Sequence, residues 1–378
     1  MLPALLALPV LSTALALVPI RRPFLLAVAA WGLSLTAMEA PLHLGLLVAA
    51  ATAGALLHGD VTTGDLVGTA MAALICAGLA AVLGRHLLAA RVLDRAWSQA
   101  GVTGESTTTR PHPRSRHRTP WLRVLFLPWP PRPRSVRART GMTYGPDRSA
   151  HRFDLYTSSA SGEVRGVIIH LHGGHFRMGA PSRESRAMLF DHAQRGWAAI
   201  SATYHLSATP EAGFPQHLVD IKRLIRWIRV EGPEHGIPAD APIVVAGSSA
   251  GGHIAMMTAL TAGDPRFQPG FEELDTSLAG AIGLYGYYGP LGPRTRQISD
   301  PVRHPAAGAP PLVVVHGTLD TYTPVWGSRR LVDHLRAGSP HAVAYAELPG
   351  AQHGFDAVQS ARYLAVVDAI ARFTDTLA

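Results

Sequence analysis

The chain has 378 residues, a mean hydropathy of +0.14, a charged fraction of 16% and a net charge of +8. A single cysteine, Cys76, excludes a disulfide within the chain and a cysteine-based zinc site. The excess positive charge lies in residues 85–140, which hold twelve arginines and two acidic residues. Because no nucleic-acid-binding motif accompanies this charge, we expect contact with membrane lipid headgroups and no nucleic acid.

Residues 1–88 form an apolar block that we predict to be a helical transmembrane domain. A membrane-spanning helix needs about 20 mainly apolar residues. The apolar runs are Leu2–Ile20, Phe24–Met38, Leu42–Leu57 and Leu66–Leu83, which predict three or four spans, with four preferred. A cleaved signal peptide would need a basic start, which Met1–Pro3 lack. A buried helical domain of a soluble protein is the other alternative.

Residues 89–140 are predicted to be a basic linker rich in proline and arginine. From residue 98 onward the composition cannot bury a core, so we expect an extended or partly disordered connector. The apolar stretch Trp121–Trp129 is the exception, and it fits either a membrane interface or a strap on the globular domain. The arginines that follow the apolar block favour a cytoplasmic side for the carboxy-terminal domain of an integral membrane protein. With four spans, Arg21 and Arg22 would then face outward, and three spans would remove that conflict.

Residues 141–378 are predicted to fold as an α/β domain, because β-branched apolar runs alternate with amphipathic helical segments. The expected strands are Phe153–Tyr156, Val167–Leu171, Trp197–Thr203, Pro242–Ala246, Leu278–Leu284, Leu312–His316 and Ala342–Glu347. The expected helices are Ser182–Arg195, Phe214–Val230, Ala250–Thr261, Trp326–Arg336 and Gln359–Leu377. This alternation indicates a mainly parallel sheet covered on both faces, with its active site at the strand carboxyl ends.

A histidine-glycine motif, His172-Gly173-Gly174, follows the strand Val167–Leu171. A tetrahedral intermediate needs backbone N–H donors aimed at its oxygen, and glycines let the backbone approach a substrate closely. We expect an oxyanion hole formed by the backbone of Gly173, Gly174 and His175, together with the amide of Ala250. His172 is expected to brace this loop through hydrogen bonds.

The motif Gly-x-Ser-x-Gly occurs as Gly247-Ser248-Ser249-Ala250-Gly251. It lies between an apolar strand and a helix, the setting in which this motif forms a nucleophile elbow. Ser248 also precedes the helix, but only Ser249 has glycine two residues before and two residues after it. We therefore predict Ser249 as a catalytic nucleophile.

A serine nucleophile needs a base, and the base needs an orienting acid. Asp320 follows the strand Leu312–His316, and His353 follows the strand Ala342–Glu347, so both come after Ser249 at strand carboxyl ends. We predict Asp320 as the acid and His353 as the base. The weaker alternatives are His316 and His341 for the base and Asp333 and Asp356 for the acid.

The substrate pocket is predicted to involve Phe176, Tyr285 and Tyr287. Phe176 follows the oxyanion loop, and the two tyrosines begin the segment Tyr285–Pro305, which also carries Tyr288. This segment fits part of an acyl pocket or cap, and ordinary packing of a strand end is an equal alternative.

Together these motifs resemble the hormone-sensitive-lipase-like esterases of the α/β-hydrolase superfamily, over about residues 144–378. Tyr204-His205-Leu206, Phe214-Pro215 and Asp220 add to the resemblance. It implies hydrolysis of carboxylic esters without a cofactor. Two positions depart from the family pattern, since His175 replaces a third glycine and His205 replaces an arginine.

We therefore predict a membrane-anchored serine hydrolase that acts on a small-molecule or lipid ester through an acyl-enzyme intermediate. An amide or peptide hydrolase or an acyltransferase would use the same triad, so these alternatives stay open. A non-catalytic binding protein on a hydrolase fold is a third alternative. No metal is expected, because the histidines lack zinc-like pairing with acidic residues at helical spacing.

Overall fold

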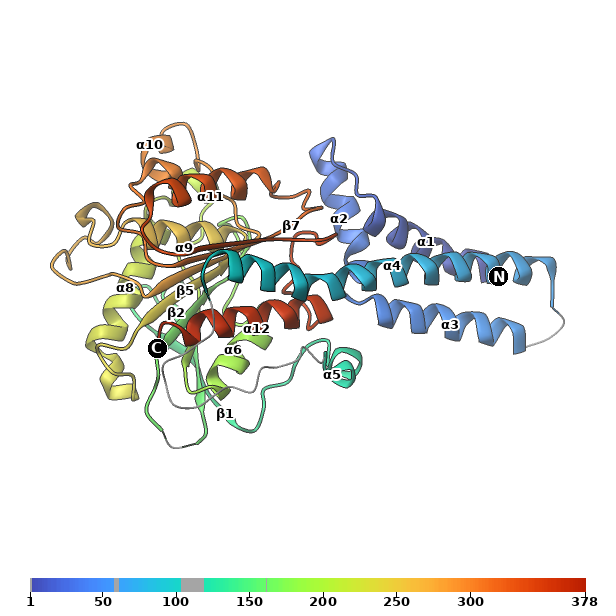
Figure 1. Cartoon of the computed structure of the whole chain (residues 1–378), viewed down its shortest axis with the longest axis horizontal. Coiled ribbons are helices and arrows are strands. Elements are labelled where there is room, and N and C mark those ends of the chain that lie inside the picture. Colours follow the sequence, from blue (N-terminus) through green and yellow to red (C-terminus); the bar gives the residue numbers. More distant parts are fainter. Residues whose placement is uncertain (1, 58–60, 103–118, 161) are drawn as a thin grey trace.

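A computed structural model describes residues 2–57, 61–102, 119–160 and 162–378. It consists of an α/β part built around one sheet and a rod of apolar helices that projects from it (Figure 1). The 37-residue helix α4, Thr63–Gln99, runs through both parts.

The sheet has eight strands in the order β1-β2-β4-β3-β5-β6-β7-β8. β1 and β2 are antiparallel to each other and β2 is antiparallel to β4, whereas the neighbours from β4 to β8 are parallel. The strands are Val136–Thr143, Arg152–Ser158, Val167–Leu171, Ala198–Ala202, Ile243–Ser248, Gly280–Leu284, Leu312–Gly317 and Val343–Leu348, numbered β1 to β8. The predicted mainly parallel sheet is confirmed, and each of the seven expected strands is present.

Helices cover both faces of the sheet, which buries every position of the five central strands β3 to β7. One face packs against α8 (Gln216–Val230), α9 (Ala250–Leu260) and α11 (Trp326–Gly338). The other face packs against α6 (Arg186–Gln194), α12 (Ala361–Asp375) and the carboxy-terminal part of α4. Short helical turns occupy connections at Pro210–Gly213 (α7), Arg296–Ser299 (α10), Gly232–His235, Pro265–Phe267 and Pro301–Arg303.

The parallel register brings the motif-bearing loops to one edge of the sheet. Leu171 at the end of β3 pairs with Gly247 on β5, and Gly247 pairs with Gly283 on β6. A Cβ atom on Gly251 would lie 2.1 Å from the carbonyl oxygen of Leu171. Glycine at position 251 is therefore what allows the helix after β5 to begin directly against the oxyanion loop.

The apolar block forms α1 (Leu2–Leu17), α2 (Phe24–Glu39), α3 (Pro41–Leu57) and the first half of α4. α1 and α3 pack along α4, whereas α2 lies near the α/β part (Figure 1). Among the described residues, α4 is the helix that is long and apolar enough to cross a membrane by itself. The pair α2–α3 meets that criterion jointly but is bent by 84°, and α1 has only 16 residues. By this criterion the described helices offer one span, or two if the bent pair counts as one, which is fewer than the three or four expected from the sequence.

The predicted linker is shorter than expected, because α4 continues beyond residue 88. Leu93 and Trp97 are buried against the sheet layer, and the Trp97 indole nitrogen donates to the carbonyl oxygen of Ala369 over 2.9 Å. Arg372 on α12 pairs with Asp94 at 2.7 Å. The apolar positions of residues 89–99 keep helical spacing, so this stretch has a face to bury and remains helical.

The far end of the predicted linker is also structured. α5, Trp121–Phe126, accepts a hydrogen bond from His43 Nε2 at the carbonyl of Leu125, over 2.7 Å. The amide of Gln359 donates to the carbonyl oxygen of Pro128 over 2.7 Å. The Trp121–Trp129 stretch therefore straps onto α3 and the α/β part, although its two tryptophan side chains remain exposed. Residues 103–118 of the predicted linker lie outside the described residues.

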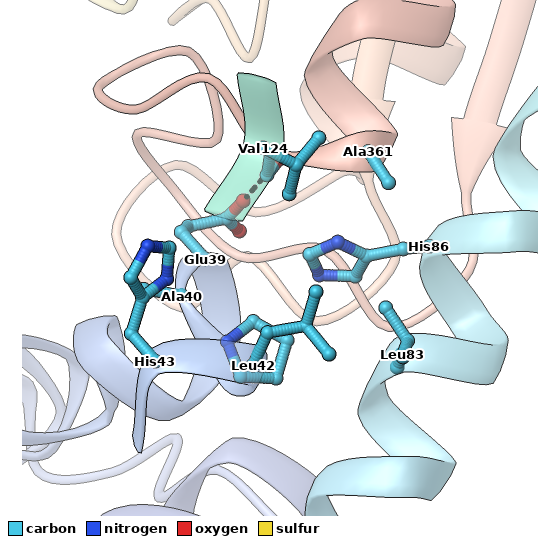
Figure 2. A pocket seen from close by; sticks show the side chains of 10 residues that line it. Glu39, Ala40, Leu42, His43, Leu83, His86, Val124 and Ala361 are labelled. Carbon is cyan, nitrogen blue, oxygen red and sulfur yellow. Dashed lines mark hydrogen bonds between the residues drawn. The ribbon is translucent and has the colours of Figure 1, made fainter. Parts of the chain in front are cut away.

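A buried ion pair joins the apolar helices to the α/β part. Arg362 Nη1 on α12 lies 2.8 Å from Glu39 Oε1 at the end of α2, and the Ser360 hydroxyl donates to Glu39 Oε2 over 3.2 Å. Figure 2 shows Glu39 between His43 and His86 at a small pocket in this junction. A buried charge without its partner is strongly unfavourable, so this pair holds α2 against the α/β part.

Candidate active site

Ser249 lies in a tight turn between β5 and α9. Its backbone angles are φ 55° and ψ −116°, in a region that L-residues rarely adopt, and its amide donates to the carbonyl oxygen of Leu284 over 2.9 Å. A Cβ atom on Gly247 would lie 2.1 Å from the carbonyl oxygen of Gly251. The two glycines of the motif thus make the sharp turn sterically feasible, and the strained serine is held by backbone contacts on both sides.

The structure brings Ser249, His353 and Asp320 into a hydrogen-bonded line. His353 Nε2 lies 2.9 Å from the Ser249 hydroxyl oxygen, and His353 Nδ1 lies 2.8 Å from Asp320 Oδ2. The Ser249 hydroxyl can donate to Nε2 when the Nδ1–H group donates to the carboxylate. This is the geometry in which an imidazole removes a proton from a serine.

Asp320 is held by backbone amides and by two imidazoles. The amides of Tyr322 and Thr323 donate to its Oδ1 over 2.9 and 2.8 Å, and His316 Nε2 lies 3.3 Å from its Oδ2. Burial alone would raise the pKa of Asp320, but His353 and His316 outweigh it and hold this pKa well below its usual value. The carboxylate therefore stays ionised and can stabilise positive charge on His353.

The alternative bases and acids lie elsewhere. His316 is buried beside Asp320; its Nε2 donates to the Thr323 carbonyl oxygen and its Nδ1 hydrogen bonds with the Ser328 hydroxyl group, not with Ser249. His341 and Asp333 are exposed. Asp356 is buried and accepts hydrogen bonds from Ser248, Ser185 and Tyr285, with a Ser248 distance of 2.7 Å.

Ser248 and Asp356 form a support beneath the elbow. His170 Nε2 donates to the Ser248 hydroxyl over 3.0 Å, and Ser248 donates to Asp356, which lies three residues after His353. The Tyr285 ring lies against the His353 ring, with 4.7 Å between centroids, while its hydroxyl group donates to Asp356. The network therefore connects the turn that carries Ser249 to the loop that carries His353.

In the loop that follows β3, one of the backbone amides predicted to bind the oxyanion is already hydrogen-bonded. The Gly173 amide donates to Glu184 Oε1, so it is not free to bind an oxyanion. Among the described residues, no acceptor contacts the amides of Gly174, His175 or Ala250, and these remain candidate donors. Gly174 and His175 have positive φ values of 122° and 58°, and a Cβ atom on Gly174 would lie 1.8 Å from the carbonyl oxygen of Met178. His172 braces the loop as expected, through Thr203 at 3.0 Å and the Gly173 carbonyl at 2.7 Å.

The three predicted pocket residues have different surroundings. Phe176 is buried against His217 and His253. Tyr285 is buried and bonded to Asp356, so its structural position is that of a support beneath His353. Tyr287 is exposed, and its amide donates to the Ser249 carbonyl oxygen over 3.3 Å, so it remains a candidate for the pocket.

Two aromatic contacts at His353 were missed in the sequence. The Tyr322 ring stacks on the His353 ring with 4.8 Å between centroids. Trp31 on α2 donates from its indole nitrogen to the His353 carbonyl oxygen over 2.8 Å. Tyr322 follows Asp320 closely and could have been suspected from that spacing, whereas Trp31 precedes His353 by 322 residues within an apolar run.

Because four histidines near the site are buried, we expect the stability of the fold to decrease at acidic pH. Burial lowers the pKa values of His170, His172 and His253 to about 4 and that of His217 to about 3. Between these values and the ordinary value of about 6.5, the unfolded chain binds protons that the fold excludes, so the free energy of unfolding falls as pH falls.

We therefore expect the melting temperature in detergent to be several degrees lower at pH 5 than at pH 7.5, measured by fluorimetry. His217→Leu should reduce this difference, because it removes one of the four imidazoles from an apolar environment. Equal melting temperatures at the two pH values would contradict the prediction.

Comparisons with known proteins agree with this fold. Residues 153–287 match the BD-FAE family model. Among solved structures, esterase 2 from Thermogutta terrifontis superposes with a TM-score of 0.54 and 22% identity, covering 65% of this chain and 96% of that one. A truncated carbohydrate esterase from gut microbiota gives a TM-score of 0.54 and 19% identity, covering 63% and 96%. These likenesses show the α/β-hydrolase fold.

Curated relatives from Mycobacterium tuberculosis extend the match. The probable carboxylic ester hydrolase LipM is 36% identical over 55% of this chain and 53% of its own length, so the chain spans about half of that relative. Esterase LipQ is 30% identical over 306 residues, which cover 74% of this chain and 70% of LipQ. The chain belongs to the esterase family of the α/β-hydrolase superfamily that includes LipQ.

Proposed function

We propose that this chain is a membrane-anchored serine hydrolase that cleaves carboxylic esters. The observation that carries the proposal is the hydrogen-bonded line from Ser249 through His353 to Asp320. The relatives support the ester as substrate class, since LipQ and LipC are named esterases and LipM a probable carboxylic ester hydrolase.

In the proposed reaction, His353 takes the hydroxyl proton of Ser249 as the serine oxygen attacks the ester carbonyl. The amides of Gly174, His175 and Ala250 stabilise the oxyanion of the tetrahedral intermediate. His353 then protonates the departing alcohol, which leaves an acyl-enzyme on Ser249. A water molecule attacks this acyl group with His353 as base, and the carboxylic acid departs as Ser249 regains its proton.

The membrane anchor is proposed from α4 and its charge pattern. Residues 66–84 carry no charged side chain, and Arg85 follows immediately. Nineteen uncharged, mainly apolar residues of helix match the hydrocarbon thickness closely. Arg85, Arg91 and Arg95 follow the apolar stretch and favour a cytoplasmic position for the hydrolase part.

The test uses the full chain purified in detergent. We expect hydrolysis of the ester p-nitrophenyl butyrate. Hydrolysis of the matching amide, butyryl p-nitroanilide, should release p-nitroaniline more slowly. A fluorophosphonate probe should label Ser249, as read by peptide mass spectrometry. Faster cleavage of the anilide, or a dominant alkyl ester product when alcohols are added, would favour an amidase or an acyltransferase. A folded protein that neither cleaves the ester nor reacts with the probe would contradict the proposal.

A further inference from the structure

Helix α2 contacts the loops that carry both partners of Ser249. Trp31 donates to the His353 carbonyl, and its ring lies 6.1 Å from the His353 ring in an edge contact. Phe24 and Trp31 each lie 5.7 Å from the Tyr322 ring, which stacks on His353. The Tyr322 amide donates to Asp320. A helix of the apolar block therefore forms one wall beside the catalytic loops.

The oxyanion loop closes toward the same wall. The His175 ring lies 6.3 Å from the Tyr322 ring, in an edge contact. Ser249 is 7% exposed and His353 is 6% exposed, so little of either group faces open solvent. The surroundings of the site thus include α2 as well as the loops of the α/β part.

The first turn of α2 is apolar and open to its surroundings. Phe24, Leu25 and Leu26 are 54%, 82% and 50% exposed. They begin the helix after the exposed residues Arg21, Arg22 and Pro23. Single exposed apolar side chains are common, but three consecutive ones on a helix continuous with an apolar rod make a patch that needs a partner.

The position of this patch points to lipid as its occupant. α2 packs on α1, which lies along the membrane-crossing candidate α4, and it meets α3 at an angle of 84° (Figure 1). If α3 and α4 follow the bilayer normal, α2 lies close to the plane of the membrane surface. The exposed apolar start of α2 fits contact with acyl chains, and the two arginines before it fit contact with lipid phosphates.

We propose that α2 lies in the membrane surface and that the site takes esters held in the bilayer, namely amphiphilic esters with a long acyl chain. This inference rests on the proposed function. Withdrawing an acyl chain into water carries a cost that grows with every methylene group. A site walled by a lipid-embedded helix lets the chain remain in apolar surroundings while its carbonyl reaches Ser249.

The test compares two substrates with the full chain reconstituted in phosphatidylcholine vesicles. One substrate is dioleoylglycerol within the vesicles, and the other is water-soluble p-nitrophenyl butyrate. Leu25→Asp places a charge on the lipid-facing side, and we expect at least about tenfold slower hydrolysis of dioleoylglycerol, with butyrate hydrolysis changed less than about twofold. Val230→Asp, at an exposed apolar position on α8, should change neither rate.

Equal losses with both substrates, or no loss with either, would overturn the inference. Labelling of Ser249 by the fluorophosphonate at the wild-type rate would show that the Leu25→Asp protein has an intact site. Leu25→Phe, which keeps an apolar side chain at this position, should retain dioleoylglycerol hydrolysis. A wild-type protein that cleaves butyrate but not dioleoylglycerol refutes the inference and leaves the proposed function standing. A wild-type protein inactive on both substrates refutes the proposed function itself.

Discussion

Ser249→Ala is expected to lower kcat for p-nitrophenyl butyrate by about ten-thousand-fold or more. The variant removes the oxygen that lies 2.9 Å from His353 Nε2, so no acyl-enzyme can form. The residual rate would come from the oxyanion donors and from substrate binding. Steady-state kinetics and the loss of fluorophosphonate labelling measure the effect.

Ser248→Ala is the matched control, because it removes the neighbouring hydroxyl from the same turn. Ser248 is fully buried and hydrogen bonds to His170 and Asp356, so its loss should weaken the support and leave labelling of Ser249 in place. A Ser249→Ala protein with wild-type turnover, or labelling that moves with Ser248 instead, would contradict the assignment of the nucleophile.

Asp320→Asn is expected to lower kcat by about a thousand-fold to ten-thousand-fold with little change in KM. Asparagine fits the space but presents a neutral amide, which no longer stabilises the imidazolium and can favour the wrong tautomer of His353. The two backbone amides that donate to Oδ1 would still hold an oxygen, so the fold should persist.

Asp333→Asn, at an exposed position on α11, is the comparison for Asp320 and should retain full turnover. Asp356→Asn should lower the melting temperature, because three hydroxyl groups donate to this buried carboxylate. If Asp356→Asn abolished turnover while Asp320→Asn left it unchanged, the two acids would have to exchange roles.

The α/β part could be predicted well from sequence because each signal is local. The run Leu312–Val315 is apolar throughout and leads through His316 and Gly317 into a turn. Gly247 and Gly251 mark the place where the backbones of a strand and the following helix approach closely. The order of Ser249, Asp320 and His353 along the chain then indicated which loops should meet.

Other features depend on contacts between distant segments. The Gly173 amide donates a hydrogen bond to Glu184, and no local sequence pattern indicates the path of the loop that brings Glu184 there. β1 lies in a stretch rich in proline and arginine, and it is a strand because β2 offers an open edge to pair with. The composition of Phe24–Glu39 predicts a membrane span, yet its Trp31 donates a hydrogen bond to the carbonyl oxygen of His353, which lies 322 residues further along the chain. Tertiary contact overrides composition at each of these positions.

The unbroken course of α4 has a mechanical consequence. The helix is about 55 Å long, and its far end is fixed to the sheet by Leu93 and Trp97. A transmembrane helix responds to a thinner or thicker bilayer by changing its tilt. In the proposed membrane-anchored state, such a tilt would rotate the whole hydrolase part together with α4, because no break in the helix separates its apolar half from the sheet. Turnover would then depend on the chain length of the surrounding phospholipids.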